Sequence, residues 1–420
     1  MIIRKVFENG LRLLVEPMQG VHTASVGIYI EGGTSCERDE IWGISHFTEH
    51  MLFKGTKTRS ARDIAIETDR LGGQINAYTA REYTCFYTRT VGEDLYRGFE
   101  ILADMVKNSV FDEAGVDIER RVISEEIDMY EDAPEELAVD LLCAGIWEGS
   151  SLAIPILGTK ESIGKITSGE LRSYAARRYT PERIVITAAG DVDFGRLSEA
   201  VELAFGGDKP GSLPRGGEDI PYRPGFVCRF KDIEQNHIAL ALPCVPLGDE
   251  GSYPAAVLSC LFGGAMSSRL FQHVREKLGL CYSIYSFTAA HRGAGMLGIY
   301  AALSPDAQEK LCDILADELV SLRGGIGEEE FERAREQFRV GAIMGNDSPS
   351  ARMGALAHGE MIYGRAVESE ELLRRIDSMT LGDVERVCRA ATDFSRLSMS
   401  IVGRCGEEDG ELLKKMREKM

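Results

Sequence analysis

The sequence predicts an α+β protein with two homologous domains, each a largely antiparallel sheet with helices packed on one face. Three observations point to this fold class. The chain has 420 residues, which suits two domains of about 200 residues better than a single core. A stretch rich in proline and glycine lies near its midpoint, and short sequence segments recur on its two sides. Strand-like and helical patterns also follow one another in the same order in each half.

The stretch near the midpoint indicates a linker. Four of the thirteen prolines and several glycines lie close together there. This composition is incompatible with a helix or a central strand. We therefore predict a first domain over residues 1–207, a linker over 208–224 and a second domain over 225–420.

The two halves carry matching segments at one constant spacing. Residues 101–104 (Ile-Leu-Ala-Asp) recur 213 positions later at 314–317, and Glu119-Arg120 recurs at the same spacing as Glu332-Arg333. Two matches at one spacing, both in helical contexts, indicate duplication of a whole domain.

Hydrophobic periodicity predicts the elements of each half. The alternation of Val26, Ile28 and Ile30 with their neighbours predicts a half-buried strand. The first half should also contain strands within 74–91 and helices near 43–54, 61–71, 93–107 and 113–131. The second half should repeat this order, with a strand near 236–243, helices near 252–262 and 267–278, strands within 281–302, and helices near 305–323 and 327–345.

Composition and charge exclude several classes of function. Apolar residues make up 44% of the chain and charged residues 27%, which is typical of a soluble globular protein. The net charge of −19 disfavours nucleic acid and anionic membrane surfaces as partners. No run approaches the roughly 18 consecutive apolar residues that span a bilayer. The N-terminus shows no basic region followed by a long apolar stretch, so we expect a cytoplasmic protein without a secretory signal.

The ten cysteines are scattered singly, with no C-x-x-C pair. This spacing argues against a zinc site built from thiolates and against a dense disulfide framework. Buried, reduced thiols in a cytoplasmic protein are the simplest interpretation.

The segment His46-Phe47-Thr48-Glu49-His50 predicts a metal site. Positions four apart lie one turn apart on the same helix face, so His46 and His50 can bind one ion. Glu49 is then placed to contact a water on that ion and take its proton. The alternative is two histidines that share a helix face by chance. A catalytic ion is favoured over a structural one, because no second pair of histidines or cysteines is present to complete four ligands.

A catalytic site needs a third protein ligand, and the segment 119–127 offers carboxylates. Glu119 and Glu126 are seven positions apart, so they face the same side of a helix two turns from each other. Glu126 could bind the ion while Glu119 supports it by holding a ligand in place. The alternative is an acidic helix face exposed to solvent.

The segment 46–56 strongly resembles the inverted zinc motif of the pitrilysin and insulinase-like peptidases. It is most similar to the branch that contains the mitochondrial processing peptidase β-subunit and bacterial processing-type peptidases. The resemblance implies one Zn²⁺ per chain, held by His46, His50 and Glu126, and it selects Glu126 over Glu125. Glu119 matches the supporting glutamate of that family.

The resemblance extends to residues expected to bind substrate. The segment 72–82 is similar to the active-site edge strand of the family, where peptides add by backbone hydrogen bonding. Asn76 and Ala77 would be the contacting positions, although the segment could be a plain strand. Arg275 and Tyr282 match a pair that binds substrate carbonyls and steadies the oxyanion. The alternative for this pair is a solvated arginine and a core tyrosine.

The predicted duplication suggests how the halves divide their roles. The spacing of 213 places Ser259, Phe262 and Gly263 opposite His46, Glu49 and His50, and it places Arg339 opposite Glu126. The second domain should therefore copy the fold without the metal ligands. The chain has half the length of four-domain family members, so the resemblance implies a clam-like homodimer. Whether Arg275 and Tyr282 act in their own subunit or across the dimer is left open.

These observations favour a zinc-dependent endopeptidase that hydrolyses unfolded peptides or presequence-like segments inside a chamber, with Glu49 as the base. One alternative is a non-catalytic scaffold subunit of the same fold. A second alternative is a zinc-dependent binding module without hydrolytic activity.

Overall fold

The computed structural model describes residues 1–37, 41–211 and 220–420. The middle of the predicted linker, residues 212–219, therefore lies outside the described residues. The chain forms two compact units that are not consecutive in sequence. The first unit comprises Met1–Ile127, Pro155–Gly216 and Ile343–Glu371, and the second comprises Asp128–Ile154, Gly217–Ala342 and Leu372–Met420. No helix within the described ranges is long and apolar enough to cross a membrane.

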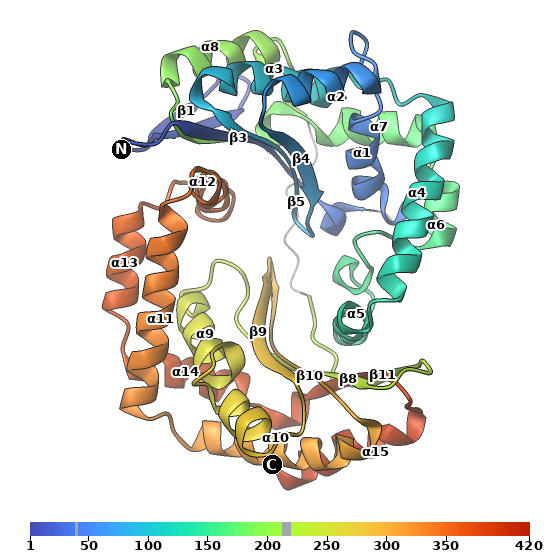
Figure 1. Ribbon diagram of the computed structural model, residues 1–420, viewed down its shortest axis with the longest axis vertical. Coiled ribbons are helices and arrows are strands. Elements are labelled where there is room, and N and C mark those ends of the chain that lie inside the picture. The colour runs from blue at the N-terminus through green and yellow to red at the C-terminus, as the bar shows by residue number, and fades with distance from the viewer. Residues whose placement is uncertain (38–40, 212–219) are drawn as a thin grey trace. The chain divides into compact units, whose positions relative to one another are not determined.

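The sheet of the first unit has the strand order β1-β2-β6-β3-β5-β4 in the part of the chain that the structure describes. Its strands are β1 (Ile3–Val6), β2 (Arg12–Pro17), β3 (Thr23–Glu31), β4 (Gln74–Thr79), β5 (Tyr83–Val91) and β6 (Ile184–Gly190). Only β2 and β6 pair in parallel, and the other neighbours are antiparallel. β4 lies at the edge of this sheet (Figure 1).

The sheet of the second unit repeats this arrangement, with the order β7-β11-β8-β10-β9 over the described residues. Its strands are β7 (Phe226–Phe230), β8 (Asn236–Pro243), β9 (Ser283–His291), β10 (Ala294–Leu303) and β11 (Ser398–Gly403). The single parallel pair, β7 with β11, corresponds to β2 with β6. The predicted α+β class with two similar, largely antiparallel sheets is therefore confirmed.

Most helices of each unit cover one face of its sheet. The first unit contains α1 (Ile44–Leu52), α2 (Ala61–Arg70), α3 (Leu95–Asn108), most of α4 (Glu113–Glu131), α6 (Lys160–Lys165), α7 (Ser168–Arg178) and α8 (Phe194–Phe205). The second contains α9 (Ser252–Ser259), α10 (Gln308–Gly324), most of α11 (Glu328–Asn346), most of α13 (Ser369–Asp377), α14 (Leu381–Ala391) and α15 (Gly410–Lys419). Where a helix was predicted near 267–278, the backbone is π-helical over Phe271–Lys277.

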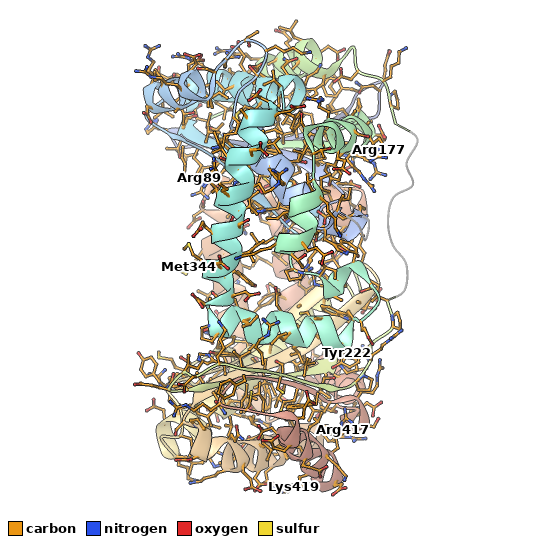
Figure 2. The ribbon with its side chains drawn as sticks, turned by 90° about the vertical axis from the view of Figure 1, so that its right-hand side faces the viewer. Arg89, Arg177, Tyr222, Met344, Arg417 and Lys419 are labelled. Carbon is orange, nitrogen blue, oxygen red and sulfur yellow. The ribbon has the colours of Figure 1, made fainter. Side chains whose placement is uncertain are left out.

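Two equivalent helices are exchanged between the halves of the sequence. Helix α5 (Pro134–Ile146) comes from the first half but packs on β8 and β11 of the second unit, and α12 (Pro349–Tyr363) comes from the second half but packs on β3 and β6 of the first (Figure 1). Tyr222, labelled in Figure 2, packs against the same core as α5. Its hydroxyl donates to the Ala241 carbonyl at 2.8 Å. The predicted linker at 208–224 separates the chain into two consecutive halves. Each compact unit instead includes one helix from the other half of the sequence.

Helix α12 explains why β3 differs from its prediction. The strand is buried on both faces, not on one, because α12 covers the face opposite to that of Val26 and Ile28. Ser25 contacts Ser350 of α12 through their hydroxyl oxygens at 2.8 Å. A Cβ on Gly27 would lie 3.1 Å from the sulfur of Met353, so glycine gives α12 room to approach.

Ion pairs to Glu360 and Arg352, two buried side chains of α12, fix this helix on the first sheet. The carboxylate of Glu360, 1% exposed, accepts two hydrogen bonds of 2.8 Å from the guanidinium of Arg4. The guanidinium of Arg352 lies 2.6 Å from the carboxylate of Glu16 on β2. Removing one partner of a buried pair costs about 3–5 kcal/mol, because the other charge stays buried without compensation.

Candidate metal centre

The metal motif lies on α1, whose first turn is held by a half-buried carboxylate. Glu37 accepts hydrogen bonds from the backbone N–H groups of Gly43, at 2.7 Å, and Ser45, at 2.8 Å. Gly43 has a φ of +89°, and a Cβ there would lie 2.5 Å from the Leu157 carbonyl oxygen, so this entry into the helix requires glycine. Burial raises the pKa of Glu37 to about 7.

The structure brings the three predicted ligands together. His46 and His50 lie one turn apart on α1, and Glu126 approaches them from α4. Oε2 of Glu126 lies 3.7 Å from Nε2 of His46 and 3.6 Å from Nε2 of His50. One ligand atom from each of these residues lies within 4.8 Å of the others, and no other group of this kind is found among the described residues.

These distances fit a tetrahedral zinc ion. Ligand atoms about 2.0–2.1 Å from zinc are about 3.4 Å apart in a tetrahedron, close to the separations between Glu126 and the two imidazoles. Two imidazoles with one carboxylate are also a donor set of catalytic zinc sites. The three side chains can therefore hold the ion with small adjustments.

The two histidines differ in their surroundings. Burial, with a smaller contribution from His50, lowers the pKa of His46 to about 3, so its ring is neutral near pH 7 and can bind a metal. Nδ1 of His46 is buried without a hydrogen-bond partner among the described residues. Nδ1 of His50 lies 3.1 Å from Oε2 of Glu119, whose other oxygen lies 2.5 Å from Nζ of Lys54. Glu119 thus lies against the His50 ring, where a supporting carboxylate would lie.

Glu49 lies beside the ligands as a buried carboxylate. Its side chain accepts a hydrogen bond of 2.5 Å from the hydroxyl of Thr79 at the end of β4. Burial raises the pKa of Glu49, and the charge of Glu126 raises it further, against the opposing effects of Thr79 and His50. A carboxylate with a raised pKa is a suitable acceptor and donor of a proton.

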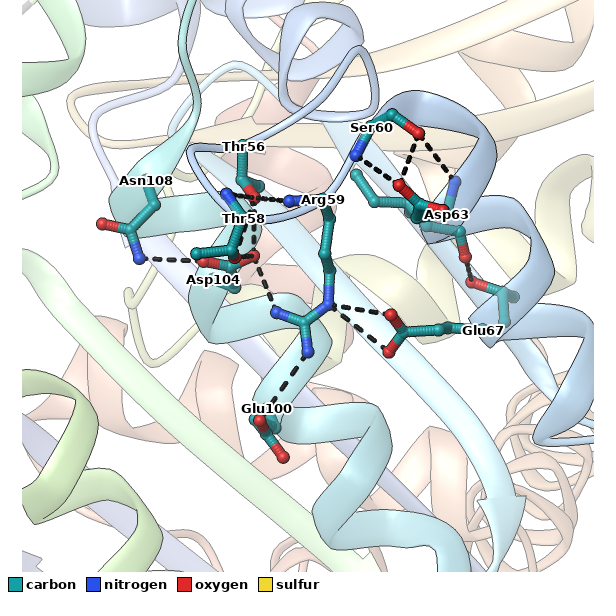
Figure 3. Close-up of polar contacts among 11 residues, drawn as sticks. Thr56, Thr58, Arg59, Ser60, Asp63, Glu67, Glu100, Asp104 and Asn108 are labelled. Atoms are coloured by element: carbon teal, nitrogen blue, oxygen red, sulfur yellow. Dashed lines mark hydrogen bonds and ion pairs between the residues drawn. The ribbon is translucent and has the colours of Figure 1, made fainter.

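The loop that follows α1 is fixed by a buried carboxylate of α3. Asp104 of α3 accepts side-chain hydrogen bonds from Thr56, Thr58, Arg59 and Asn108, at 2.7–3.1 Å (Figure 3). Burial alone would raise the pKa of Asp104, but these hydrogen bonds hold it below its usual range. The loop between α1 and α2 is thereby held against α3.

The predicted contact strand reaches the same centre. Asn76 and Ala77 lie on the edge strand β4, and the N–H of Ala77 donates to Oδ1 of Asn76 at 2.9 Å. Because Thr79 of β4 donates to Glu49, this edge ends beside the candidate metal ligands.

Arg275 and Tyr282 lie together in the second unit. The guanidinium of Arg275 contacts two aromatic rings, 4.6 Å from the centre of Phe271 and 4.5 Å from that of Tyr282. Tyr282 is 76% exposed, which excludes the alternative that it belongs to the core.

The second unit offers no ligands at the equivalent positions. Ser259 contacts Ser286, and a Cβ on Gly263 would lie 2.4 Å from the backbone nitrogen of Ser286, so no larger side chain fits there. Arg339, opposite Glu126, donates to Asp377 at 2.8 Å. The four equivalent positions hold no histidine or carboxylate.

Three residues at the centre were not singled out from the sequence: Glu37, Lys54 and Thr79. Each contacts a partner on another element. Glu37 contacts the first turn of α1, Lys54 contacts Glu119 of α4, and Thr79 contacts Glu49 of α1. Lys54 follows His50 at the helical spacing of four, which was a signal for a shared face. No pattern in the sequence pairs Thr79 with Glu49.

Comparisons with known families cover both halves. The pattern of the family described as Insulinase (Peptidase family M16) matches residues 12–160, and that of the Peptidase M16 inactive domain matches residues 165–338. The uncharacterized zinc protease YmxG of Bacillus subtilis is 37% identical over 390 residues, covering 93% of this chain and 95% of that protein. The uncharacterized zinc protease Rv2782c of Mycobacterium tuberculosis is 38% identical over 392 residues, with coverage of 92% and 90%.

Solved structures share the fold. A protease from Helicobacter pylori has a TM-score of 0.88 at 18% identity, over 96% of this chain and 99% of that one. A chain of Complex III2 from Candida albicans has a TM-score of 0.85 at 19% identity, over 100% and 99%.

Proposed function

Since this chain belongs to peptidase family M16, the insulinase family, we propose that it is a zinc metalloendopeptidase that hydrolyses unfolded peptides or presequence-like segments. The observation that carries this proposal is the convergence of His46, His50 and Glu126 around one point. The names of the similar zinc proteases support the metal and the general activity.

The proposal places one zinc ion per chain between the two Nε2 atoms and the carboxylate of Glu126. When bound, zinc polarises a peptide carbonyl and makes water a better nucleophile near neutral pH. Glu119 orients His50 from Nδ1, and burial keeps His46 neutral.

Glu49 is the proposed general base and acid. Its carboxylate takes a proton from the attacking water and passes it to the leaving amine. The hydroxyl of Thr79 donates a hydrogen bond of 2.5 Å to the carboxylate of Glu49. This bond would keep Glu49 in one position while it accepts and donates the proton.

Substrate would bind as an extended strand. The open edge of β4 suits backbone pairing near Asn76 and Ala77, and Thr79 connects this edge to Glu49. Arg275 and Tyr282 are the proposed donors to substrate carbonyls and to the oxyanion. A chamber formed by a homodimer, which would exclude folded proteins by size, is part of the proposal.

A non-catalytic scaffold is the second candidate, since the fold is shared with a chain of Complex III2. A scaffold does not require three convergent ligand side chains with a buried carboxylate beside them. The observed centre therefore favours the peptidase.

A quenched fluorogenic peptide separates the candidates. The zinc-loaded chain should cleave it, lose activity with a chelator and regain it with zinc. A folded protein of the same composition should resist cleavage, and light scattering should report a dimer. Zinc binding without cleavage would indicate a binding module, and the absence of both would indicate a scaffold.

A further inference from the structure

We propose that Lys54 is a positioning residue of the metal centre, which holds Glu119 so that Glu119 in turn fixes the ring of His50. This inference rests on the zinc site of the proposed function and adds the side chain that keeps one of its ligands aligned.

The geometry forms a chain of three side chains. Glu119 is 3% exposed, and its two oxygens point to different partners: Oε2 lies 3.1 Å from Nδ1 of His50, and Oε1 lies 2.5 Å from Nζ of Lys54. Lys54 itself is 39% exposed, so its ammonium is still solvated on one side. Lys54 thus contacts the buried carboxylate of Glu119 while part of its own side chain remains in solvent.

Charge balance explains why an ammonium belongs there. A histidine that gives Nε2 to a metal carries its proton on Nδ1 and is neutral, so it donates a hydrogen bond to Glu119 without neutralising it. A buried carboxylate is unfavourable unless its charge is compensated. Lys54 supplies the compensating charge on the opposite oxygen, and Glu119 can remain in place behind His50.

The backbone places Lys54 rigidly. It lies four residues after His50 and next to Phe53, the residue that caps α1, and its N–H donates to the carbonyl of Met51 at 3.1 Å. Two residues later, Thr56 donates to Asp104 at 2.7 Å and pairs with Ser109 in an isolated β-bridge (Figure 3). The backbone is therefore fixed on both sides of Lys54. A fixed backbone keeps the ammonium of Lys54 aligned with the carboxylate of Glu119.

The test measures zinc affinity, not activity. The full-length chain is freed of zinc, and dissociation constants are obtained by competition with a chromophoric chelator for the wild type, Lys54→Met, Lys54→Arg and the control Lys57→Met. Lys57 lies in the same loop and is exposed. The cobalt(II) absorption spectrum reports ligand geometry directly. Lys54→Gln replaces the methionine variant if the latter does not fold.

Lys54→Met should bind zinc about tenfold more weakly, at the lower end of the range for residues that support a ligand, with an altered cobalt spectrum. The zinc dissociation constant of Lys54→Arg should stay within roughly threefold of the wild-type value, because the charge is kept. That of Lys57→Met should equal the wild-type value. Unchanged affinity and spectrum in Lys54→Met, or equal losses in Lys57→Met, would overturn the inference. If the wild type binds no zinc, the proposed function fails instead.

Discussion

Nε2 of His46 on α1 lies 3.7 Å from Oε2 of Glu126 on α4, and Nε2 of His50 lies 3.6 Å from the same oxygen. Two helices from distant parts of the sequence thus present three metal-binding side chains to one point.

Replacement of Glu49 by Gln should separate metal binding from chemistry. The variant should keep zinc, because Glu49 is not one of the three ligands, but peptide hydrolysis should fall by about 10²–10⁴-fold through loss of the base. Steady-state cleavage and zinc content by elemental analysis check this. Glu125→Gln, at an exposed position of α4, is the matched control and should behave as wild type. Normal turnover by Glu49→Gln would remove Glu49 from the mechanism.

The variant His50→Ala should lose zinc and activity together. A site with one imidazole and one carboxylate lacks the three protein ligands of a catalytic zinc. Elemental analysis after dialysis measures the loss. His22→Ala, which changes an exposed histidine, should retain the metal. Unchanged zinc content in His50→Ala would refute this ligand assignment.

Glu37 should make stability depend on pH. Burial raises its folded-state pKa to about 7, above the unfolded value of about 4.3, so the folded chain holds the extra proton between these values. The stability contributed by this group is present below about pH 4.3 and is lost as pH rises through about 7. The free energy of unfolding, measured relative to Glu37→Gln, should fall by on the order of 3 kcal/mol between pH 4.5 and 7.5. If the difference in free energy of unfolding between the wild type and Glu37→Gln did not change with pH, this prediction would be wrong.

The ion pair between Arg352 and Glu16 should contribute to the docking of α12. The variant Arg352→Met leaves the Glu16 carboxylate without its partner and should lower the free energy of unfolding by about 3 kcal/mol. Arg386→Met removes a far more exposed pair with Asp383 and should cost less than about 1 kcal/mol. Denaturant unfolding measures both, and a double-mutant cycle with Glu16→Gln isolates the pair. Equal effects of the two arginine substitutions would show that α12 is not held by this contact.

Local patterns in the sequence were sufficient for much of the fold and the site. The spacing of His46 and His50 needs one helix only, and α1 places them as predicted. Duplication was visible from matching segments, because equivalent helices occupy equivalent positions in both halves. The choice of Glu126 over Glu125 came from the resemblance, since periodicity alone leaves both on one helix.

What the sequence did not predict depends on contacts between distant segments. The alternation in β3 indicated one buried face, but α12, from the other half, covers the second. The exchange of α5 and α12 cannot be read from composition, because the partner sheet of each helix lies in the other half of the sequence. The contacts of Thr79 with Glu49 and of Lys54 with Glu119 arise only once strands and helices are assembled.

The most direct test of the central claim is anomalous X-ray scattering at the zinc absorption edge from crystals of the zinc-loaded chain. We expect one strong peak per chain, about 2.0–2.2 Å from Nε2 of His46, Nε2 of His50 and a carboxylate oxygen of Glu126. A peak bound by other residues, or no peak at these three side chains in fully loaded protein, would contradict it.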